Sequence, residues 1–305
     1  MKVLITGGAG FIGTNLSLKL LKKSYDVKII DDLSTGLKSN IPEDAEFINQ
    51  SITELDQIKK AVKDCEVVVH LGARGSVPRS IKNPIATHDV NSTGTLNVLE
   101  AAKQNGSHFI FSSSSSVYGS NKILPKNEDM VLRPTTPYAA SKLSGEALSM
   151  AYAKSYNLPV SVFRFFNIFG PWQRPDHEYA AVLPKWIDKC LKNEEIELFG
   201  DGEQTRDFTY VETVVDLISS CISKKVLHPE PVNLAYGNNI SLNQVVAILK
   251  TSFPNIKVKN SQTRSGDILH SKNDPKIIKS LYPEITVQNF EDSLLRTIEW
   301  FKSKK

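Results

Sequence analysis

The chain has 305 residues, of which 40% are hydrophobic and 23% are charged, and its formal net charge is +4. This composition is ordinary for a globular protein and provides enough apolar residues for a large core. Lysine and arginine are interspersed with acidic residues before the last five positions, which argues against a nucleic-acid-binding surface. No run of 18 apolar residues is present, so we expect no association with a membrane.

The cysteines and the N-terminus indicate the compartment. Cys65, Cys190 and Cys221 are far apart and form neither a Cys-x-x-Cys pair nor a zinc-binding pattern, which favours a reducing environment. Only three apolar residues precede a glycine cluster at the N-terminus, which is too short for a secretory signal. The six histidines show no metal-ligand spacing. We therefore expect a cytoplasmic protein without a bound metal.

The first half of the chain alternates short apolar segments with longer amphipathic ones. Strands are predicted over 2–6, 27–30, 46–48, 67–70, 109–111 and 160–165, and helices over about 11–22, 54–63, 85–104 and 138–156. Such alternation predicts an α/β fold with a doubly wound parallel sheet of the Rossmann type. Ligands of such sheets bind beyond the carboxyl ends of the strands.

The pattern changes in the second half. Residues 167–208 are rich in loops with a helix predicted near 182–192, a strand over 232–234 could rejoin the main sheet, and 238–305 read as small α/β pieces ending in a helix over about 290–302. We expect two domains. A nucleotide-binding domain would comprise residues 1–166 with about 205–235, and a smaller C-terminal α/β substrate domain would comprise about 167–204 and 236–305.

A glycine-rich turn follows the first predicted strand. Gly7, Gly10 and Gly13 are spaced three apart and run directly into a predicted helix. Glycines at this spacing permit a tight turn in which backbone N–H groups approach a pyrophosphate, and the helix N-terminus adds partial positive charge. Strand, turn and helix together predict a dinucleotide site.

Two aspartates, Asp31 and Asp32, end the second predicted strand. A carboxylate at this place can accept hydrogen bonds from the adenosine ribose hydroxyls and would repel the additional phosphate of NADP. No arginine follows nearby to reverse this preference. The sequence therefore predicts NAD as the cofactor.

Tyr138 and Lys142 are four residues apart at the start of a strongly helical segment, so their side chains share one helix face. A tyrosine with its usual pKa near 10 is a poor base at neutral pH. An adjacent ammonium, together with the positively charged nicotinamide of NAD, would favour the phenolate. A lowering of the pKa by about 2–3 units needs only about 3–4 kcal/mol of electrostatic free energy.

Polar residues follow two further strands. Five serines, residues 112–116, come after the strand predicted over 109–111, where a hydroxyl would project above the sheet and could orient a sugar hydroxyl. Residues 164–167, with the sequence Arg-Phe-Phe-Asn, form a second such strand end.

Together these motifs resemble the extended short-chain dehydrogenase/reductase superfamily, and within it the NAD-dependent sugar-nucleotide epimerases and dehydratases. The matching segments are the glycine turn, Tyr138-x-x-x-Lys142, the serine-rich strand end, Phe-Asn-Ile-Phe-Gly-Pro at 166–171, residues 200–208 and residues 264–267. They occur in the family's order over nearly the whole chain. The resemblance is strongest to the bacterial UDP-N-acetylglucosamine 4-epimerases.

The resemblance implies a set of NAD-binding residues. These are Gly7, Gly10, Phe11, Ile12, Gly13, Asp31, Asp32, Ser34, Thr35, Gly36, Ser51, Ile52, Leu71, Gly72, Ala73, Asn91, Ser112, Tyr138, Lys142 and Phe165. Ser51 departs from the family pattern, because an aspartate often contacts the adenine there.

Catalytic roles are implied as well. Tyr138 would take the proton of the sugar 4-hydroxyl while hydride leaves C4 for NAD, and Lys142 would tune the tyrosine and hold the nicotinamide ribose. The hydroxyl partner corresponds to Ser114, with Ser113 and Ser115 one residue away. The 4-keto sugar would then turn about its diphosphate linkage and receive hydride on its other face, which inverts C4 without net oxidation.

A third implied set binds the UDP-sugar. It consists of Ser76, Ser114, Tyr138, Asn167, Gln173, Ala181, Val182, Phe199, Arg206, Arg264, Asp267 and Ser271. Arg206 and Arg264 correspond to diphosphate ligands, for which a planar guanidinium is suited, and Asp267 to a group that binds the uridine ribose. Ser271 stands where glucose-restricted relatives have a bulky tyrosine, so it should leave room for an acetamido group.

Several alternatives stay open. A UDP-glucose 4-epimerase, a UDP-glucuronate epimerase and a UDP-glucuronate decarboxylase would share this scaffold. A 4,6-dehydratase is disfavoured, because it needs an Asp-Glu pair where this chain has Ser115 and Ser116. An inert NAD-binding regulator is disfavoured by the retained Tyr138 and Lys142.

Members of the family typically form homodimers through two helices of each subunit, here near 85–104 and 138–156. Apolar residues of these segments permit such an interface and would equally suit packing on the sheet; they are Leu96, Val98, Leu99, Leu148 and Met150.

Overall fold

The computed structural model describes residues 1–176, 180–262 and 270–304. The chain folds as two compact units. Unit 1 consists of Met1–Lys122, Glu128–Phe165 and Val215–Leu234, and unit 2 of Ile123–Asn127, Phe166–Val214 and Ala235–Lys305. Residues 205–214, which were expected in the nucleotide-binding domain, belong to unit 2, because their strands pair within that unit.

Unit 1 is built on a seven-stranded sheet. Its elements are β1 (Lys2–Thr6), α1 (Phe11–Lys22), β2 (Asp26–Ile30), η1 (Lys38–Asn40), β3 (Glu46–Ile48), α2 (Leu55–Val62), β4 (Val67–His70), α3 (Val77–Lys82), α4 (Pro84–His88), η2 (Asp89–Thr93), α5 (Gly94–Asn105), β5 (His108–Ser114), η3 (Ser115–Tyr118), α6 (Pro137–Tyr156), β6 (Val160–Phe165), most of α8 (Val211–Lys224) and β11 (Val232–Leu234). The strand order is β11-β6-β5-β4-β1-β2-β3, and all neighbouring pairs are parallel. This order confirms the predicted doubly wound Rossmann-type fold.

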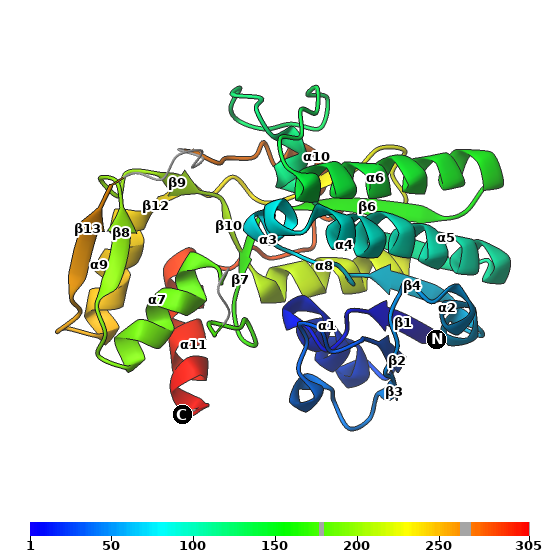
Figure 1. The fold of residues 1–305 in the computed structure, drawn as a ribbon, viewed down its shortest axis with the longest axis horizontal. Helices are drawn as coiled ribbons and strands as arrows, with labels where there is room; N and C mark the ends of the chain where they lie inside the picture. Colours follow the sequence, from blue (N-terminus) through cyan, green and yellow to red (C-terminus); the bar gives the residue numbers. More distant parts are fainter. Residues whose placement is uncertain (177–179, 263–269, 305) are drawn as a thin grey trace. The chain divides into compact units, whose positions relative to one another are not determined.

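Helices cover both faces of the sheet (Figure 1). α2, α5 and α6 share one apolar core with the strands, in which Val68, Leu99 and Phe109 are fully buried. α1 and α8 lie on the other face, where Lys19 forms an ion pair with Asp216. Because both faces are covered, the strands are apolar along their length instead of alternating, which is why they could be recognised in the sequence.

Some elements differ from their predicted form. The helix predicted over 85–104 is divided into α4, a π-helical turn over Asp89–Thr93 and α5. β5 continues to Ser114, because the backbone pairing of its last residues with β6 does not require apolar side chains. α8 was not predicted, since it follows β10 directly and opens with β-branched valines that favour a strand.

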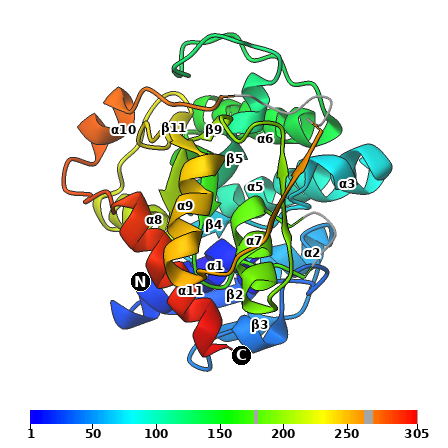
Figure 2. The same ribbon diagram turned by 90° about the vertical axis from the view of Figure 1, so that its left-hand side faces the viewer.

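Unit 2 contains short strands and three main helices. Its elements are β7 (Asn167–Phe169), α7 (Val182–Leu191), β8 (Ile196–Phe199), β9 (Thr205–Arg206), β10 (Phe208–Tyr210), β12 (Ile240–Ser241), α9 (Leu242–Ser252), β13 (Val258–Ser261), α10 (Lys276–Leu281) and α11 (Phe290–Ser303). α11 packs against both α7 and α9 (Figure 2). The ring of Phe290 lies 5.3 Å from that of Phe169 and 5.2 Å from that of Phe208, so α11 is anchored on β7 and β10.

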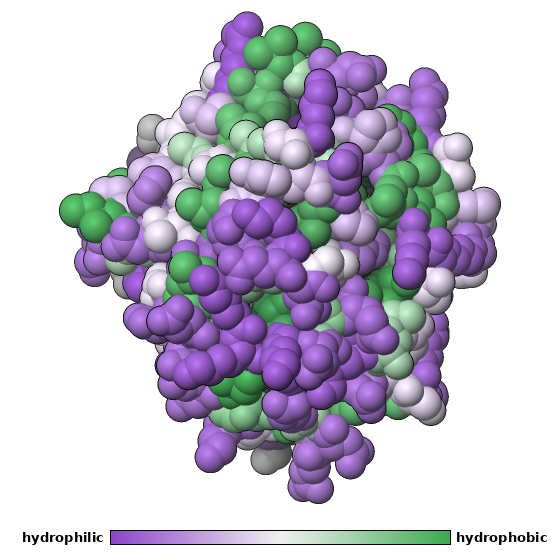
Figure 3. All heavy atoms as spheres, turned by 90° about the vertical axis from the view of Figure 1, so that its right-hand side faces the viewer, coloured by the Kyte–Doolittle hydropathy of each residue, from purple (hydrophilic) through white to green (hydrophobic). Residues whose placement is uncertain are grey.

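The outer surface is largely polar where Figure 3 shows it, with separate hydrophobic areas between hydrophilic ones. Of the apolar residues expected at a dimer interface, Val98 and Leu99 are buried in the core of unit 1, and Leu148 and Met150 pack against it. Leu96 is exposed. Among the described residues, no helix has the length and apolar character needed to cross a bilayer.

Candidate active site

The glycine turn leaves no room for side chains. Gly7 has a φ of +70°, and its carbonyl accepts the N–H of Gly10 at 3.2 Å. A Cβ added at Gly13 would stand 2.4 Å from the Gly7 oxygen and 2.6 Å from Cα of Gly8. Gly10 is the N-cap of α1, and the first turn carries neither a capping side chain nor an acidic residue. The first N–H groups of α1 are thus left for an anion, which fits the pyrophosphate of a dinucleotide.

The two aspartates after β2 differ in their surroundings. Asp31 is buried, and its carboxylate accepts the N–H groups of Ala9 (3.0 Å) and Leu33 (2.8 Å). Burial raises the pKa of Asp31, while these two N–H groups oppose the rise. Asp32 is exposed and accepts the N–H of Ser34 at 2.9 Å. Asp31 therefore holds the glycine turn against the end of β2, and Asp32 is accessible to a ligand.

The remaining predicted cofactor residues follow the other strands. Phe11 and Ile12 begin α1, Ser34, Thr35 and Gly36 follow β2, Ser51 and Ile52 follow β3, Leu71, Gly72 and Ala73 follow β4, Ser112 lies near the end of β5, and Phe165 ends β6. Because these strands are all parallel, the structure brings the residues together along one edge of the sheet.

A buried histidine connects three elements at this edge. His70 Nδ1 lies 2.6 Å from Oγ1 of Thr6, which also accepts the N–H of Gly72 at 3.0 Å. Its Nε2 lies 2.9 Å from Oγ1 of Thr95 in α5. Burial, with a smaller contribution from Lys142, lowers the pKa of His70 to about 3, so the imidazole is neutral. The ends of β1 and β4 are thereby fixed to α5.

Asn91 lies within the π-helical turn and joins the loop after β4 to α6. Its Oδ1 accepts the N–H of Arg74 at 2.8 Å, and its Nδ2 donates to Oγ of Ser141 at 3.0 Å. Ser141 in turn donates to the carbonyl of Tyr138 at 2.8 Å. The π-helical turn thus presents an amide that orients the start of α6, and such turns are frequent at functional sites.

The candidate catalytic residues meet where β5 ends and α6 begins. Thr136 caps α6 by accepting the N–H of Ala139, and Pro137 occupies the first helical position. This start fixes Tyr138 in the first turn, where Ser114 acts on its hydroxyl so as to lower its pKa. Lys142 follows one turn later, and its Nζ donates to the carbonyl of Ser112 at 2.8 Å.

The structure also distinguishes the three serines left open by the sequence. Ser114 is bonded to Tyr138, whereas Ser113 donates to Oε1 of Glu146 at 2.5 Å. Ser115 begins η3 beyond the end of the strand. Ser114 is therefore the candidate for the proton relay.

The groups of the protein itself shift the pKa values of Tyr138 and Lys142 in opposite directions. Burial raises the pKa of Tyr138, and the hydrogen bond from Ser114 opposes the rise. Burial also lowers the pKa of Lys142 to about 8, against the attraction of Glu146. The ammonium of Lys142 is bonded to a strand carbonyl, so the groups of the protein itself keep Tyr138 protonated at neutral pH.

Unit 2 gathers part of the expected substrate set around β9. Arg206 lies in β9, and Asn167 donates to the carbonyl of the next residue, Asp207, at 3.3 Å. The N–H of Ser271 donates to the carbonyl of Thr205 at 3.1 Å. Asn167, Arg206 and Ser271 are therefore neighbours within this unit.

The other expected substrate residues are more widely distributed. Gln173 donates to the carbonyl of Ile168 at 3.3 Å, Ala181 and Val182 begin α7, Phe199 ends β8, and Ser76 in unit 1 caps α3. Arg264 and Asp267 lie outside the described residues. The described residues contain no cluster of His, Cys, Asp or Glu that could hold a metal ion.

Three buried charged residues near these sites carry no predicted role. Glu146 and Arg164 form a salt bridge at 2.9 Å inside unit 1, and Asp207 is fully buried in unit 2. A glutamate on the inner face of a helix and an arginine in an apolar strand are rarely buried unless they are paired. The positions of Glu146 and Arg164 in the sequence could therefore have indicated a buried ion pair.

Comparison with known proteins identifies the family. The family model described as "NAD dependent epimerase/dehydratase family" matches residues 3–235. The structure of UDP-N-acetylglucosamine 4-epimerase from Methanobrevibacter ruminantium M1, in complex with UDP-N-acetylmuramic acid, is 35% identical with a TM-score of 0.93, covering 100% of this chain and 99% of that one.

Two further solved structures have similar likeness. UDP-glucose 4-epimerase from Thermotoga maritima, with UDP-glucose, is 33% identical with a TM-score of 0.93, covering 100% of this chain and 99% of that one. UDP-glucuronic acid 4-epimerase from Bacillus cereus, with UDP-glucuronic acid and NAD, is 30% identical with a TM-score of 0.91, covering 100% of both chains. The chain belongs to the NAD-dependent epimerase/dehydratase family.

Proposed function

We propose that the protein is a 4-epimerase that interconverts UDP-N-acetylglucosamine and UDP-N-acetylgalactosamine through a 4-keto intermediate. The observation that carries this proposal is the placement of the Tyr138 hydroxyl where Ser114 acts to lower its pKa, one helical turn from Lys142, in a chain whose glycine turn fits a dinucleotide. The cofactor is NAD. When bound, NAD supplies the redox chemistry by accepting the hydride of C4 and returning it to the opposite face.

The residues of the chain supply proton transfer and orientation. Tyr138 takes the proton of the sugar 4-hydroxyl in the first half of the reaction and returns it in the second, so protons balance over the cycle. Ser114 donates its hydrogen bond to the phenolate and orients the sugar oxygen. Lys142, whose pKa is about 8, stays largely protonated at neutral pH and can hold the nicotinamide ribose. Since burial raises the pKa of Tyr138, the positive nicotinamide is needed to favour its phenolate.

The small residue at position 271 supports an acetamido sugar. The backbone of Ser271 is bonded to Thr205, directly beside Arg206, whose guanidinium we infer to bind the diphosphate. A diphosphate on Arg206 would bring the hexose within reach of this position. A serine leaves space for a C2 acetamido group that a tyrosine would fill. UDP-glucose and UDP-glucuronate are the alternative substrates, because 4-epimerases of both are similar to this chain.

The reaction can be tested by NMR of the anomeric protons. Purified protein would be incubated separately with UDP-N-acetylglucosamine, UDP-glucose and UDP-glucuronate, without added reductant. We expect the galacto epimer of the acetamido sugar to form at least as fast as that of glucose. Turnover of UDP-glucose or UDP-glucuronate alone would refute the proposed acetamido substrate. A decarboxylated or 4-keto-6-deoxy product would refute the reaction class. No turnover of any of the three would favour an inert regulator.

Two variants test the pocket. Ser271→Tyr should suppress turnover of the acetamido sugar while that of UDP-glucose continues, and Ser271→Ala should retain both. Equal loss of both substrates in Ser271→Tyr would contradict a role for this position in selecting the C2 substituent.

We also propose a cytoplasmic homodimer. Large apolar side chains are exposed on or beside the helices that serve this purpose in the family, namely Ile81, Ile85, Leu96 and Tyr156. Light scattering coupled to gel filtration should give about twice the mass of one chain, and Ile85→Glu should reduce it. A monomeric mass for the wild-type protein would refute the dimer.

A further inference from the structure

Three successive residues of β5 bind three residues of α6 that are spaced four apart. Ser114 acts on the hydroxyl of Tyr138 so as to lower its pKa, and the carbonyl of Ser112 accepts Nζ of Lys142 at 2.8 Å. The residue between them, Ser113, donates to Oε1 of Glu146 at 2.5 Å. Positions four apart lie on one face of a helix, so this face of α6 contacts β5 through three residues, two of them by hydrogen bonds.

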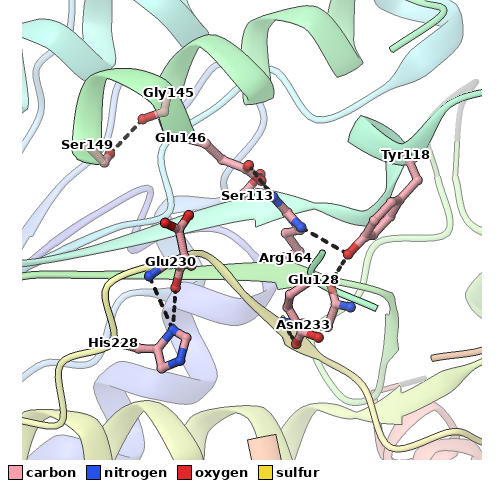
Figure 4. Close-up of polar contacts among 10 residues, drawn as sticks. All are labelled: Ser113, Tyr118, Glu128, Gly145, Glu146, Ser149, Arg164, His228, Glu230 and Asn233. Atoms are coloured by element: carbon pink, nitrogen blue, oxygen red, sulfur yellow. Dashed lines mark hydrogen bonds and ion pairs between the residues drawn. The ribbon is translucent and has the colours of Figure 1, made fainter. Parts of the chain in front are cut away.

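Glu146 extends this contact across the sheet (Figure 4). Ser113 stands opposite Arg164 in the register of β5 and β6, and Arg164 stands opposite Asn233 in the register of β6 and β11. Both carboxylate oxygens of Glu146 accept from the guanidinium of Arg164, at 2.9 Å each. Arg164 also donates to the hydroxyl of Tyr118 at 3.0 Å, which donates to Oδ1 of Asn233 at 2.7 Å. One helix is thereby joined to three neighbouring strands.

Both charges of this pair are buried. Glu146 is 2% exposed and Arg164 is 4% exposed. The attraction within a buried ion pair often does no more than offset the cost of removing its charges from water, and an apolar pair of similar volume can be as stable. A contribution to stability therefore does not explain why charged residues occupy this place. Their fixed directions of hydrogen bonding, which apolar side chains lack, set the position of α6 along and around its axis.

We propose that Glu146 is a positioning residue, which with Ser113 and Arg164 holds α6 at the height where the Tyr138 hydroxyl meets Ser114. The expected change in kcat rests on the proposed function. The contacts themselves all lie within unit 1 and do not depend on it. Loss of the Glu146 contacts releases α6 from β5 one turn beyond Lys142, and the bond between Tyr138 and Ser114 lengthens.

The charged and titratable groups around this helix predict a distinctive titration. Tyr138 accepts a hydrogen bond that lowers its pKa, so displacement of α6 raises that pKa. Removal of a negative charge at Glu146 has the opposite effect through space, because a nearby carboxylate disfavours a phenolate. Lys142 faces Glu146 on α6, and the imidazole of His70, with a pKa of about 3, stays neutral beside it. In a variant without the Glu146 charge, a rise in the pKa of Tyr138 therefore indicates displacement of α6, and a fall indicates a direct electrostatic effect.

The test compares Glu146→Gln with Ser149→Ala in the NAD-bound protein. Ser149 is also buried in α6, but its hydroxyl donates to the carbonyl of Gly145 within the same helix at 2.6 Å (Figure 4). We expect Glu146→Gln to reduce kcat by about 10²-fold with KM for the UDP-sugar unchanged, because a displacement of about 1 Å has an effect of this size. Ser149→Ala should retain kcat. Equal losses in both variants, or wild-type kcat in Glu146→Gln, would overturn the proposal.

A second readout does not depend on turnover. The ultraviolet absorbance of the Tyr138 phenolate, obtained by subtracting the titration of Tyr138→Phe, should move to higher pH in Glu146→Gln. An unchanged midpoint, or one at lower pH, would refute displacement even if the proposed reaction is wrong. If the wild-type protein converts no UDP-sugar but the midpoint still moves to higher pH in Glu146→Gln, the proposed function is refuted and the positioning role is retained.

The double variant Glu146→Gln/Arg164→Met covers the case in which Glu146→Gln does not fold, since it leaves no unpaired buried charge. We expect its melting temperature to exceed that of Glu146→Gln while kcat remains low. If the double variant recovers both the melting temperature and the kcat of the wild type, Glu146 and Arg164 contribute only to stability and the positioning role is refuted.

Discussion

Replacing Asp207 by asparagine perturbs a fully buried carboxylate of unit 2. Asp207 is fully buried and accepts the N–H groups of Asn273 (2.8 Å), Gly237 (3.0 Å) and Asn238 (3.0 Å), and also that of Tyr236. These bonds join the loop after β11 and the segment before α10 to the strand region that carries Arg206. Burial nevertheless outweighs the four bonds and raises the pKa of Asp207 from 3.8 to about 6.

The sign of the pH dependence follows from this shift. Below pH 3.8 the carboxyl is protonated in both the folded and the unfolded chain. Between pH 3.8 and about 6 the unfolded chain loses its proton first, so the free energy of unfolding falls as the pH rises. Above pH 6 the loss is complete and amounts to about 3 kcal/mol. Asparagine does not titrate, so the free energy of unfolding of Asp207→Asn lacks this pH dependence. Each N–H group that the amide leaves unpaired costs about 1–3 kcal/mol, and this cost is the same at every pH.

Urea unfolding at pH 4 and pH 7.5 measures the difference. The three tryptophans, Trp172, Trp186 and Trp300, all lie in unit 2, so their fluorescence reports on this unit. The free energy of unfolding of wild type minus that of Asp207→Asn should be about 2 kcal/mol greater at pH 4 than at pH 7.5, because a small part of the loss has already occurred at pH 4. Asp201→Asn removes an exposed carboxylate of the same unit and serves as the control. A difference that is constant with pH, or greater at pH 7.5, would show the reasoning to be wrong.

Three further predictions concern unit 1. Tyr138→Phe should reduce kcat by about 10²–10⁴-fold while NAD still binds, measured by NMR turnover and calorimetry, and near-normal turnover would exclude Tyr138 as the acid–base. Gly13→Ala should abolish NAD binding in calorimetry, because its Cβ would stand 2.4 Å from the Gly7 oxygen; unchanged affinity would contradict this geometry. Gly145→Ala should lower the free energy of unfolding, measured in urea, since its Cβ would stand 2.4 Å from the ring of Phe111. Overpacking of about 1–3 kcal/mol outweighs a gain in helix propensity of about 1 kcal/mol, and a more stable variant would contradict this estimate.

The parallel sheet could be predicted because burial on both faces makes its strands continuous apolar runs. β1, β4 and β6 have the predicted bounds for this reason. β3 also has its predicted bounds, but it is an edge strand and only partly buried. The same rule ended β5 too early at Phe111, where serines begin. It also concealed α8, whose opening segment contains β-branched valines that favour a strand.

From their spacing alone, Tyr138 and Lys142 could be predicted only to share one face of a helix. Their partners could not be predicted, because Ser114 and Tyr138 are distant in sequence and meet through the crossover of α6 onto β5. The pairing of Glu146 with Arg164 depends in the same way on the register of β5 and β6. The pKa of Tyr138 likewise depends on burial, which a sequence pattern does not give.

The route of the chain between its units has a consequence for engineering and for evolution. The backbone passes from one unit to the other at 122–123, 127–128, 165–166, 214–215 and 234–235. Exchange of unit 2 with that of a relative therefore needs five junctions, and no single recombination event can transfer it. Changes in unit 2 are accordingly easier to acquire by point substitutions than by shuffling of modules.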